Sequence, residues 1–513
     1  MTDMAANPVL TSSRQLDARA LIAKRYRAER RFRAYGIAAL SVSAVFLVLL
    51  FADIFTKGAP AFIEHRLVPK LAADPAALDP QNTHDPKIIV AGDFDGIIKE
   101  KLRSLVPQAT TRADRKKLTG LLSSGAADDF RAMVTANPSL IGREIEVPVL
   151  LSDDADQYLK GNQTGVIYLA GQGPLGIAAD GEAFTLAVTA PEAIGLKTGD
   201  IVRADGGAFR ITTITPGGIA AEALMAPQSL DPVKSGEWDA LRFTVPEANR
   251  RIDDVEALYL ERIKDQGLVE RGFAWRFLTT GDSREPELAG IRGALVGTAL
   301  MLFVTLILCL PIGVAAAIYL EEFAPRNRVT EVIEVNINNL AAVPSIVFGL
   351  LGLAVFLNFF GLPRSAPLVG GLVMALLVLP TIIIASRAAL RAVPPSIKEA
   401  ALGVGASQQQ AVFHHVLPLA MPGIMTGTII GMAHALGETA PLLMIGMVAF
   451  IVDIPTGLTG AATVLPVQIY LWSDLPEIAF QSKTAAAIIV LLAFLFVMNA
   501  SAIVLRRRFE RRW

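Results

Sequence analysis

The sequence predicts an all-α polytopic membrane protein with six spans and an inserted extracytoplasmic α+β domain. Three observations predict this fold class: apolar runs long enough to cross a bilayer, one long charged segment between the first two runs, and basic clusters at both ends. The 513 residues are 52% hydrophobic although 19% are charged, which indicates that the apolar residues are gathered in membrane spans. The net charge of −1 gives no indication of nucleic-acid binding.

Six segments are long and apolar enough to be spans, since a spanning helix needs roughly 20 such residues. The expected helices cover residues 34–55, 293–320, 339–361, 367–390, 419–450 and 484–505. The first apolar run is too long for the core of a secretory signal and follows a long N-terminal flank, residues 1–33. We therefore expect it to be an uncleaved membrane anchor.

Lys and Arg indicate the orientation of the spans, because cytoplasmic flanks carry an excess of these residues. Residues 1–33 contain eight Lys and Arg, and the tail 506–513 contains five Arg. We therefore expect both termini in the cytoplasm, which requires an even number of spans. With six spans, the loop around Glu399 is also cytoplasmic, and the segment between the first two spans lies outside.

Residues 57–288 separate the first two spans and are too numerous for a simple loop. Local patterns predict strands at 88–90, 144–151 and within 184–214, and helices at 112–134 and 252–263. The insert is therefore expected to be an α+β domain on the outer face of the membrane. It contains no metal-ligand spacing, phosphate-binding loop or nucleophile motif, and it could contact a solute receptor, a partner permease or the cell wall.

The loop between the fourth and fifth expected spans contains Glu399-Ala400-Ala401, Gly405 and Leu417-Pro418, with the spacing E-A-A-x3-G-x11-L-P. Small residues let a helix lie close to a partner, Gly405 can adopt a positive φ in the turn, and Pro418 suits the first turn of a helix. The pattern resembles the EAA loop of bacterial ABC-importer permeases, a cytoplasmic helix-turn-helix that docks into an ATPase subunit. The resemblance implies a six-span ABC-importer permease fold over residues 289–505, coupled to the ATPase through the loop 399–418. His415 departs from the family pattern, which usually has an aliphatic residue there.

Further strings resemble the PstA family, the permease subunits of bacterial phosphate ABC importers. They lie at 319–322, 333–340, 343–347, 435–441 and 465–470. The resemblance covers residues 268–513 and the first span, and the insert looks like an extra domain carried by only some PstA-type chains. It implies a multi-pass protein of the bacterial inner membrane, in contact with lipid, that imports phosphate. The implied partners are a PstC-type permease, two PstB-type ATPase subunits and a PstS-type periplasmic phosphate-binding protein.

Several polar residues and helix breakers lie inside the expected spans. Pro344 and Pro441 interrupt helical hydrogen bonding, which a membrane tolerates where the backbone faces protein or a water-lined cavity. His434 and Glu438 are four residues apart and share one helix face, and ionisable groups at this depth usually face a cavity or a partner. The candidates for a translocation path or gate are Arg387, Arg391, His434, Glu438, Thr439 and Ser345.

Arg387 is the first candidate for phosphate, because the planar guanidinium fork matches that anion. It also matches an Arg that is common in PstA-type chains. Those chains often carry a Glu shortly after it, whereas Ala388 and Ala389 follow here. Any ion-pair gate at this point is therefore expected to take its acid from another part of the chain.

The sequence contains no G-x-x-x-x-G-K-[ST] string. We therefore expect no enzyme activity and no cofactor or metal on this chain, with ATP and Mg²⁺ bound by the partner ATPase. Its one cysteine, Cys309, excludes a disulfide within the chain.

Two other functions are alternatives to phosphate import. The first is a permease for another oxyanion, molybdate or sulfate, although the strings at 437–441 and 465–470 favour the phosphate family. The second is a membrane sensor whose insert binds a ligand, although a sensor should carry a recognisable cytoplasmic output domain. A signalling role added to transport stays open.

Overall fold

The computed structural model describes residues 8–180, 183–188, 191–215 and 218–509. The chain divides into two compact units, Met1–Lys57 and Gly58–Trp513, which are considered separately. The first unit is occupied by helix α1 (Pro8–Gly58), which contains the expected first span and whose apolar window has no buried residues. A helix of this composition is stable only where lipid or a partner covers its apolar side chains.

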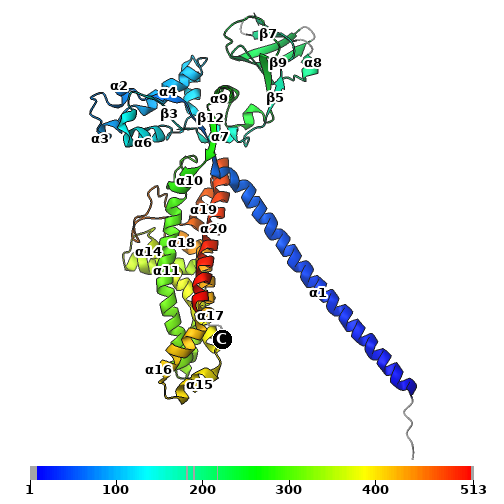
Figure 1. Ribbon diagram of the computed structural model, residues 1–513, viewed down its shortest axis with the longest axis vertical. Helices are drawn as coiled ribbons and strands as arrows, with labels where there is room; N and C mark the ends of the chain where they lie inside the picture. Colours follow the sequence, from blue (N-terminus) through cyan, green and yellow to red (C-terminus); the bar gives the residue numbers. More distant parts are fainter. Residues whose placement is uncertain (1–7, 181–182, 189–190, 216–217, 510–513) are drawn as a thin grey trace, which may run out of the picture. The chain divides into compact units, whose positions relative to one another are not determined.

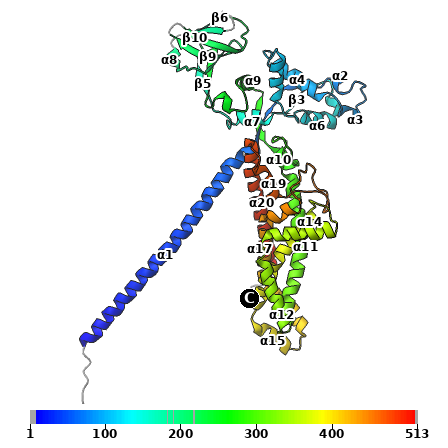
Figure 2. The same cartoon turned by 180° about the vertical axis from the view of Figure 1, so that it is seen from behind.

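The second unit contains the other candidate spans (Figures 1 and 2). They are α11 (Arg292–Ile318) with the π-helical turn η4 (Tyr319–Phe323), α14 (Pro367–Arg391), α17 (Leu417–Gly437) and α20 (Ile478–Phe509). A bent pair follows α11: α12 (Arg328–Ala341), then α13 (Ser345–Leu351) with the π-helical segment η5 (Gly352–Phe359), at 103° to each other. Within the described ranges, five helices could cross a membrane, or six if the bent pair is one span.

Two expected spans differ from the structure. The helix expected at 339–361 is broken at Val343 and Pro344, because Pro344 has no N–H to donate and its ring disfavours helical backbone at the preceding residue. The helix expected at 419–450 ends at Gly437. Only the short α18 (Ala440–Met444) follows before α19 (Leu465–Ser473), and Pro441 in the first turn of α18 suits a new helix start rather than a continuation.

Small residues let the membrane helices approach one another closely, as is usual in membrane bundles. A Cβ added at Gly371 of α14 would lie 2.5 Å from the Val304 side chain of α11. The Thr305 hydroxyl donates to the Gly371 carbonyl at 3.2 Å, and the Cys309 thiol donates to the Ala375 carbonyl at 3.1 Å. The contact between α11 and α14 is therefore both tight and hydrogen-bonded.

The insert is an α+β region with three antiparallel sheets (Figure 1). The strands of the largest sheet, in spatial order, are β5 (Val166–Ala170), β11 (Trp238–Phe243), β8 (Ile201–Ala204), β9 (Gly207–Thr215), β10 (Gly218–Met225), β7 (Ala183–Val188) and β6 (Leu175–Asp180). The other sheets are β12 (Val269–Phe273), β1 (Ile63–Leu67) and β4 (Val149–Leu150), and the pair β2 (Lys70–Ala72) and β3 (Glu144–Glu146). The helices are α2 (Pro75–Leu78), α3 (Pro86–Ile89), α4 (Phe94–Leu105), α5 (Arg112–Gly120), α6 (Asp128–Ala136), α7 (Asp153–Leu159), α8 (Pro191–Ile194), α9 (Asp254–Asp265) and α10 (Trp275–Thr279).

Most of the secondary structure expected in the insert is present, with three differences. The strand expected at 144–151 is broken at Val147 and Pro148 into β3 and β4, which belong to different sheets, because Pro148 has no N–H to donate to a sheet. The strand expected at 88–90 is wrong, because Asp85 caps the Lys87 amide and Pro86 begins helix α3. The helix expected at 112–134 is two helices, α5 and α6, separated by a turn that contains Gly125. A Cβ at Gly125 would meet the Leu288 side chain at 2.6 Å, so this turn lies tightly against the segment that leads into α11.

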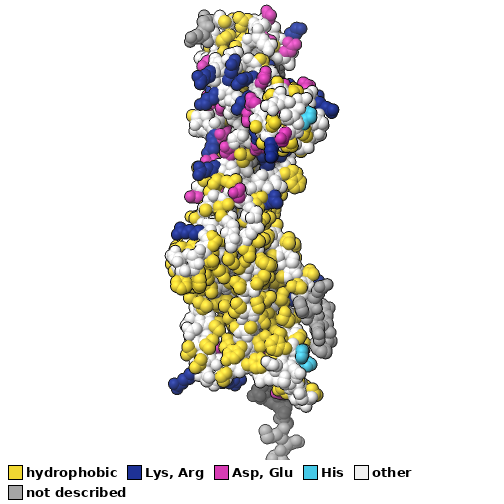
Figure 3. All heavy atoms as spheres, turned by 90° about the vertical axis from the view of Figure 1, so that its left-hand side faces the viewer, with side chains coloured by type: hydrophobic (Ala, Val, Ile, Leu, Met, Phe, Trp, Pro, Cys, Tyr) yellow, Lys and Arg dark blue, Asp and Glu magenta, His cyan; other side chains and the backbone are white. Residues whose placement is uncertain are grey.

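The insert joins the membrane helices through a buried collar, which we define by the apolar cluster of Phe277, Trp472, Phe480, Ala486 and Ala487 with their neighbours. Strands β1 and β12 pair from Ile63↔Phe273 to Leu67↔Val269, so the chain enters and leaves the insert side by side. Figure 3 shows the resulting division: apolar side chains dominate over the helices, and charged side chains gather over the insert.

Candidate functional site

The EAA-like segment forms a helix-turn-helix. Helix α15 (Pro395–Gly403) contains Glu399, Ala400 and Ala401, and α16 (Gln408–Ala411) follows a short turn. Gly405 lies in that turn with φ of +92°, which confirms the left-handed backbone expected there. Glu399 and Ala400 are exposed, whereas Ala401 is buried against the bundle.

We call the segment 395–418 the coupling loop after its expected role, and three of its large apolar side chains are exposed. Val404 is 87% exposed, Phe413 is 50% exposed and Leu402 is 42% exposed. Large apolar side chains at this level of exposure, gathered on one loop, are typical of a surface that a partner covers.

Leu417 and Pro418 lie within a continuous helical stretch rather than at a fresh helix start. The chain runs from α16 through the π-helical turn η6 (Val412–Val416) directly into α17. A proline inside a helix removes one hydrogen bond and clashes with the carbonyl four residues earlier. The wider π turn directly before Pro418 accommodates both effects. His415 is exposed, so the departure from the family pattern leaves no gap in the core.

The two arginines at the end of α14 are held by carboxylates from other elements. Arg387 Nη2 lies 2.6 Å from Glu334 Oε1 of α12, and its Nε lies 3.4 Å from Glu321 Oε2 of η4. Arg391 Nε lies 2.7 Å from Glu321 Oε1. The expectation that the acid would come from elsewhere is therefore met by Glu321 and Glu334.

A second ion pair joins the coupling loop to the same π turn. Lys398 of α15 pairs with the Glu322 carboxylate, and the Gln408 side chain of α16 donates to the Glu322 carbonyl at 2.6 Å. Glu321 and Glu322 are adjacent, yet one contacts α14 and the other contacts both helices of the coupling loop.

The two interrupted helices meet inside the bundle. A Cβ at Gly349 of α13 would lie 2.7 Å from the Cα of Pro441 in α18, so the two backbones nearly touch. Ser345 is half-buried in the first turn of α13, and Thr439 lies directly before α18. His434 Nε2 and Glu438 Oε1 are 2.9 Å apart at the end of α17.

Known proteins with similar sequences identify the family of this chain. The family model described as "binding-protein-dependent transport system inner membrane component" matches residues 309–513, and a model of a domain of unknown function matches residues 19–166. The phosphate transport system permease protein PstA 1 of Mycobacterium tuberculosis is 31% identical over 238 residues, which are 46% of this chain and 77% of that protein. The chain belongs to the PstA-type permeases.

Further proteins are similar to parts of this chain. PstA 2 of Mycobacterium bovis is 31% identical over 48% of this chain and 82% of its own length. The probable ABC transporter permease YqgI of Bacillus subtilis is 36% identical over 33% of this chain, and the chain spans 58% of that relative. Among solved structures, an inward-facing MetNI methionine ABC transporter chain matches 43% of this chain and 96% of its own length, with 19% identity and a TM-score of 0.34. The PstA-type chain is thus a membrane-embedded permease subunit of an ABC transporter, and ATP hydrolysis belongs to a separate partner in this family.

The candidate path residues of this PstA-type permease fall into two groups. Gly423 of α17 lies against Ala389 of α14, and Gly431 lies against Val378. The helices therefore run antiparallel, and Arg387 is about two and a half turns from the level of His434 and about three and a half turns from that of Glu438. Ser345 lies in α13 and His434 in α17, whereas Glu438 and Thr439 lie between α17 and α18, so the expected shared helix face of His434 and Glu438 is wrong. Arg387 and Arg391 belong to the ion-pair network.

Sequence reasoning missed the acidic and polar members of that network. Glu321, Glu322, Glu334, Lys398 and Gln408 were not named as site residues. One signal was available: two adjacent glutamates end an otherwise apolar span, where ionisable groups usually face a partner.

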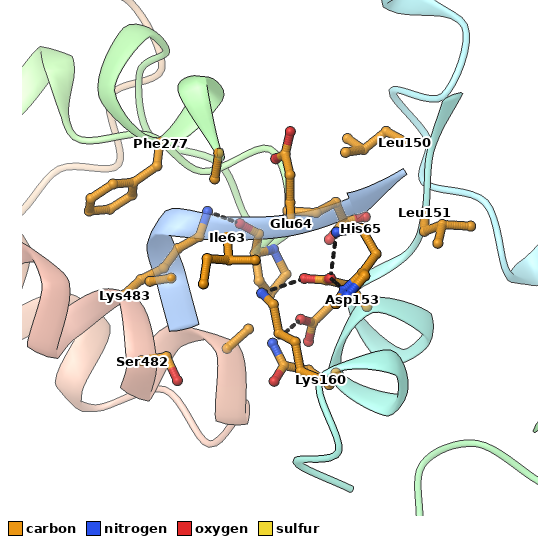
Figure 4. A pocket seen from close by; sticks show the side chains of 17 residues that line it. Ile63, Glu64, His65, Leu150, Leu151, Asp153, Lys160, Phe277, Ser482 and Lys483 are labelled. Atoms are coloured by element: carbon orange, nitrogen blue, oxygen red, sulfur yellow. Dashed lines mark hydrogen bonds and ion pairs between the residues drawn. The ribbon is translucent and has the colours of Figure 1, made fainter. Parts of the chain in front are cut away.

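A second polar cluster lies in a cavity of about 30 Å³ where the insert meets α20 (Figure 4). The Lys483 ammonium donates to the Ala289 and Pro286 carbonyls, and Phe277 lies beside it. Burial raises the pKa of Asp153 to about 6. Burial also raises the pKa of Glu287. For Asp156, burial is outweighed by hydrogen bonds from His65 and Lys160, which lower the pKa of that carboxyl. A cavity of this size holds about one water molecule. The polar cluster therefore forms a structural joint between the insert and α20 rather than a ligand pocket.

Proposed function

We propose that this chain is the PstA-type subunit of an ATP-driven phosphate importer of the bacterial inner membrane. A PstC-type permease would complete the translocation path, two PstB-type subunits would bind ATP and Mg²⁺, and a PstS-type periplasmic protein would deliver phosphate. The assignment of phosphate as the substrate rests on the 31% identity to PstA proteins over 77% and 82% of their lengths. The exposed coupling loop supports the attachment of an ATPase.

The proposed topology uses the bent pair as one span, which gives six spans in total. Both termini and the loop 399–418 would lie in the cytoplasm, and the insert would lie in the periplasm. The charge distribution supports this orientation, with eight Lys and Arg before the first span and five Arg after the last. The exposed apolar faces of α1 and α12 would then contact lipid or the partner permease.

The proposed transport step starts when ATP closes the ATPase dimer and moves the coupling loop. The bundle then opens inward at the contact between α13 and α18. Ser345 lies in the first turn of α13, Thr439 directly precedes α18, and His434 and Glu438 lie at the end of α17. Arg387 and Arg391 would exchange carboxylate partners for phosphate as the anion passes, because both ligands fit a guanidinium fork. Release follows when the glutamates return to the arginines.

Uptake of radiolabelled phosphate tests this function. Membrane vesicles containing this chain with PstC-, PstB- and PstS-type partners should accumulate phosphate when ATP is inside, and excess molybdate or sulfate should not compete. Uptake of another oxyanion would leave a permease with a different substrate. No uptake by a correctly assembled complex, together with ligand binding by the insert, would favour a sensor.

A glycine substitution in the coupling loop tests the docking. Gly405→Val forces a β-branched residue to a positive φ, which should distort the turn and abolish uptake while membrane insertion and partner assembly persist. Gly403→Ala is the matched control, because Gly403 is helical and a Cβ there meets open space. Normal uptake by the Gly405→Val complex would contradict docking through this loop.

A further inference from the structure

The acidic pair Glu321 and Glu322 connects two parts of the transporter that the proposed function treats separately. We propose that Glu322 is a positioning residue that transmits movement of the coupling loop to Arg387 and Arg391 through the π turn η4. This inference rests on the proposed function, because it assigns the residues by which ATPase movement reaches the path.

Both helices of the coupling loop are attached to Glu322. The Glu322 side chain is 10% exposed and pairs with Lys398 of α15, while its carbonyl accepts a hydrogen bond from Gln408 of α16. Lys398 is directly followed by Glu399, which is exposed and makes no ion pair among the described residues. Adjacent residues of α15 thus have different surroundings: Lys398 binds the bundle, and Glu399 is free to contact a partner.

Glu321 provides the other half of the connection. Its two carboxylate oxygens contact Arg391 at 2.7 Å and Arg387 at 3.4 Å, and Arg387 also contacts Glu334 at 2.6 Å. Three carboxylates face three cations in this network, so its charges balance. The coupling loop, α12 and α14 are therefore tied to one point of the chain.

The π turn allows neighbouring glutamates to serve different partners. The Ala324 amide donates to the Tyr319 carbonyl at 2.7 Å, which closes the wide turn. Side chains of consecutive helical residues diverge by about 100° around the axis. Glu321 therefore contacts α14 while Glu322 contacts α15 and α16, and a displacement of one glutamate displaces the other through a single peptide unit.

A largely buried ion pair is suited to transmission because parting it leaves uncompensated charge. If the coupling loop moves, Lys398 and Gln408 can either carry Glu322 along or lose both contacts. If Glu322 moves with the loop, Glu321 moves too, and its contacts with Arg387 and Arg391 change. A static brace would need the same contacts, so the distinction requires a measurement of coupling rather than of stability.

The decisive experiment compares phosphate uptake with ATP hydrolysis in the assembled complex. Glu322→Gln and Lys398→Met should each lower the phosphate imported per ATP by on the order of fivefold or more while hydrolysis continues, since site–site coupling energies are typically of that size. The exchanged pair Glu322→Lys with Lys398→Glu should restore much of that ratio. Glu331→Gln is the matched control, because Glu331 of α12 is exposed and makes no ion pair among the residues the structure describes.

Each outcome has one meaning. An unchanged ratio in both single variants, or a parallel loss of uptake and hydrolysis that the exchanged pair does not restore, overturns the relay. Recovery in the exchanged pair excludes general misfolding of the single variants as the cause. A wild-type complex that hydrolyses ATP without importing phosphate contradicts the proposed function instead, so the two failures are distinguishable.

Discussion

The two ends of the membrane helices are built in different ways. The collar below the insert buries Phe277, Trp472 and Phe480 almost completely, and the Lys483 ammonium is fixed by backbone carbonyls. The coupling-loop end is held by ion pairs, and Arg391 there is 60% exposed. Close-packed apolar contacts resist rearrangement, whereas an ion pair with a solvated member, such as Glu321–Arg391, exchanges partners at little cost. The comparison indicates a fixed joint at the insert and a movable joint at the coupling loop.

The largest loss of stability is expected from substitutions in the collar, if the collar is the fixed joint. Trp472→Ala removes a buried ring and its 3.0 Å hydrogen bond to Asp282, so it should lower the free energy of unfolding by about 3–5 kcal/mol. Trp275→Ala is the control, because Trp275 is 63% exposed. Thermal unfolding of the purified complex checks both variants. Equal effects of the two substitutions would remove the basis for a fixed joint.

The buried carboxyls should make the fixed joint sensitive to pH. The pKa of Asp153 is raised from 3.8 to about 6 by burial, so the folded protein binds more protons than the unfolded chain between about pH 4 and pH 6. Its contribution to stability is therefore greatest at low pH and declines as pH rises through this window, by about 3 kcal/mol in total.

Asp153→Asn should remove this dependence and make the insert more stable than the wild type above pH 6. Resistance of the insert to proteolysis, measured at pH 4.5 and pH 7.5, checks the difference. Asp231→Asn changes an exposed carboxyl that does not line this cavity and should leave the pH dependence as it is. A wild type whose proteolysis has the same pH profile as Asp153→Asn would show that this carboxyl does not titrate in the joint.

The smallest effect is expected at the movable joint. Arg391→Gln should change the free energy of unfolding by less than about 1 kcal/mol, because the guanidinium is largely solvated. The difference from wild type should also vanish at about 1 M salt, where such pairs are screened. Arg364→Gln, at an exposed Arg with no ion pair among the described residues, serves as the control in the same unfolding assay. A loss as large as that of Trp472→Ala would mean that both ends are fixed.

Local features of the fold were predictable from the sequence, and contacts between distant elements were not. The turn at Gly405 and the break at Pro344 follow from backbone chemistry, and both residues were singled out in the sequence, although the span at 339–361 was expected as one helix. The pairing of Arg387 with Glu334 could not be derived, because it depends on where α12 lies beside α14. The hydrogen bonds of Lys483 could not be derived either, because the Pro286 and Ala289 carbonyls that accept them lie nearly 200 residues away in sequence.

The π turn before Pro418 also determines the rotational phase of the coupling loop. Each residue added to or removed from a helix turns everything beyond it by about 100°. Deleting one residue from η6 would turn α15 and α16 away from Glu322, although no contact residue had changed. Length changes should therefore not be tolerated in the five residues from Val412 to Val416.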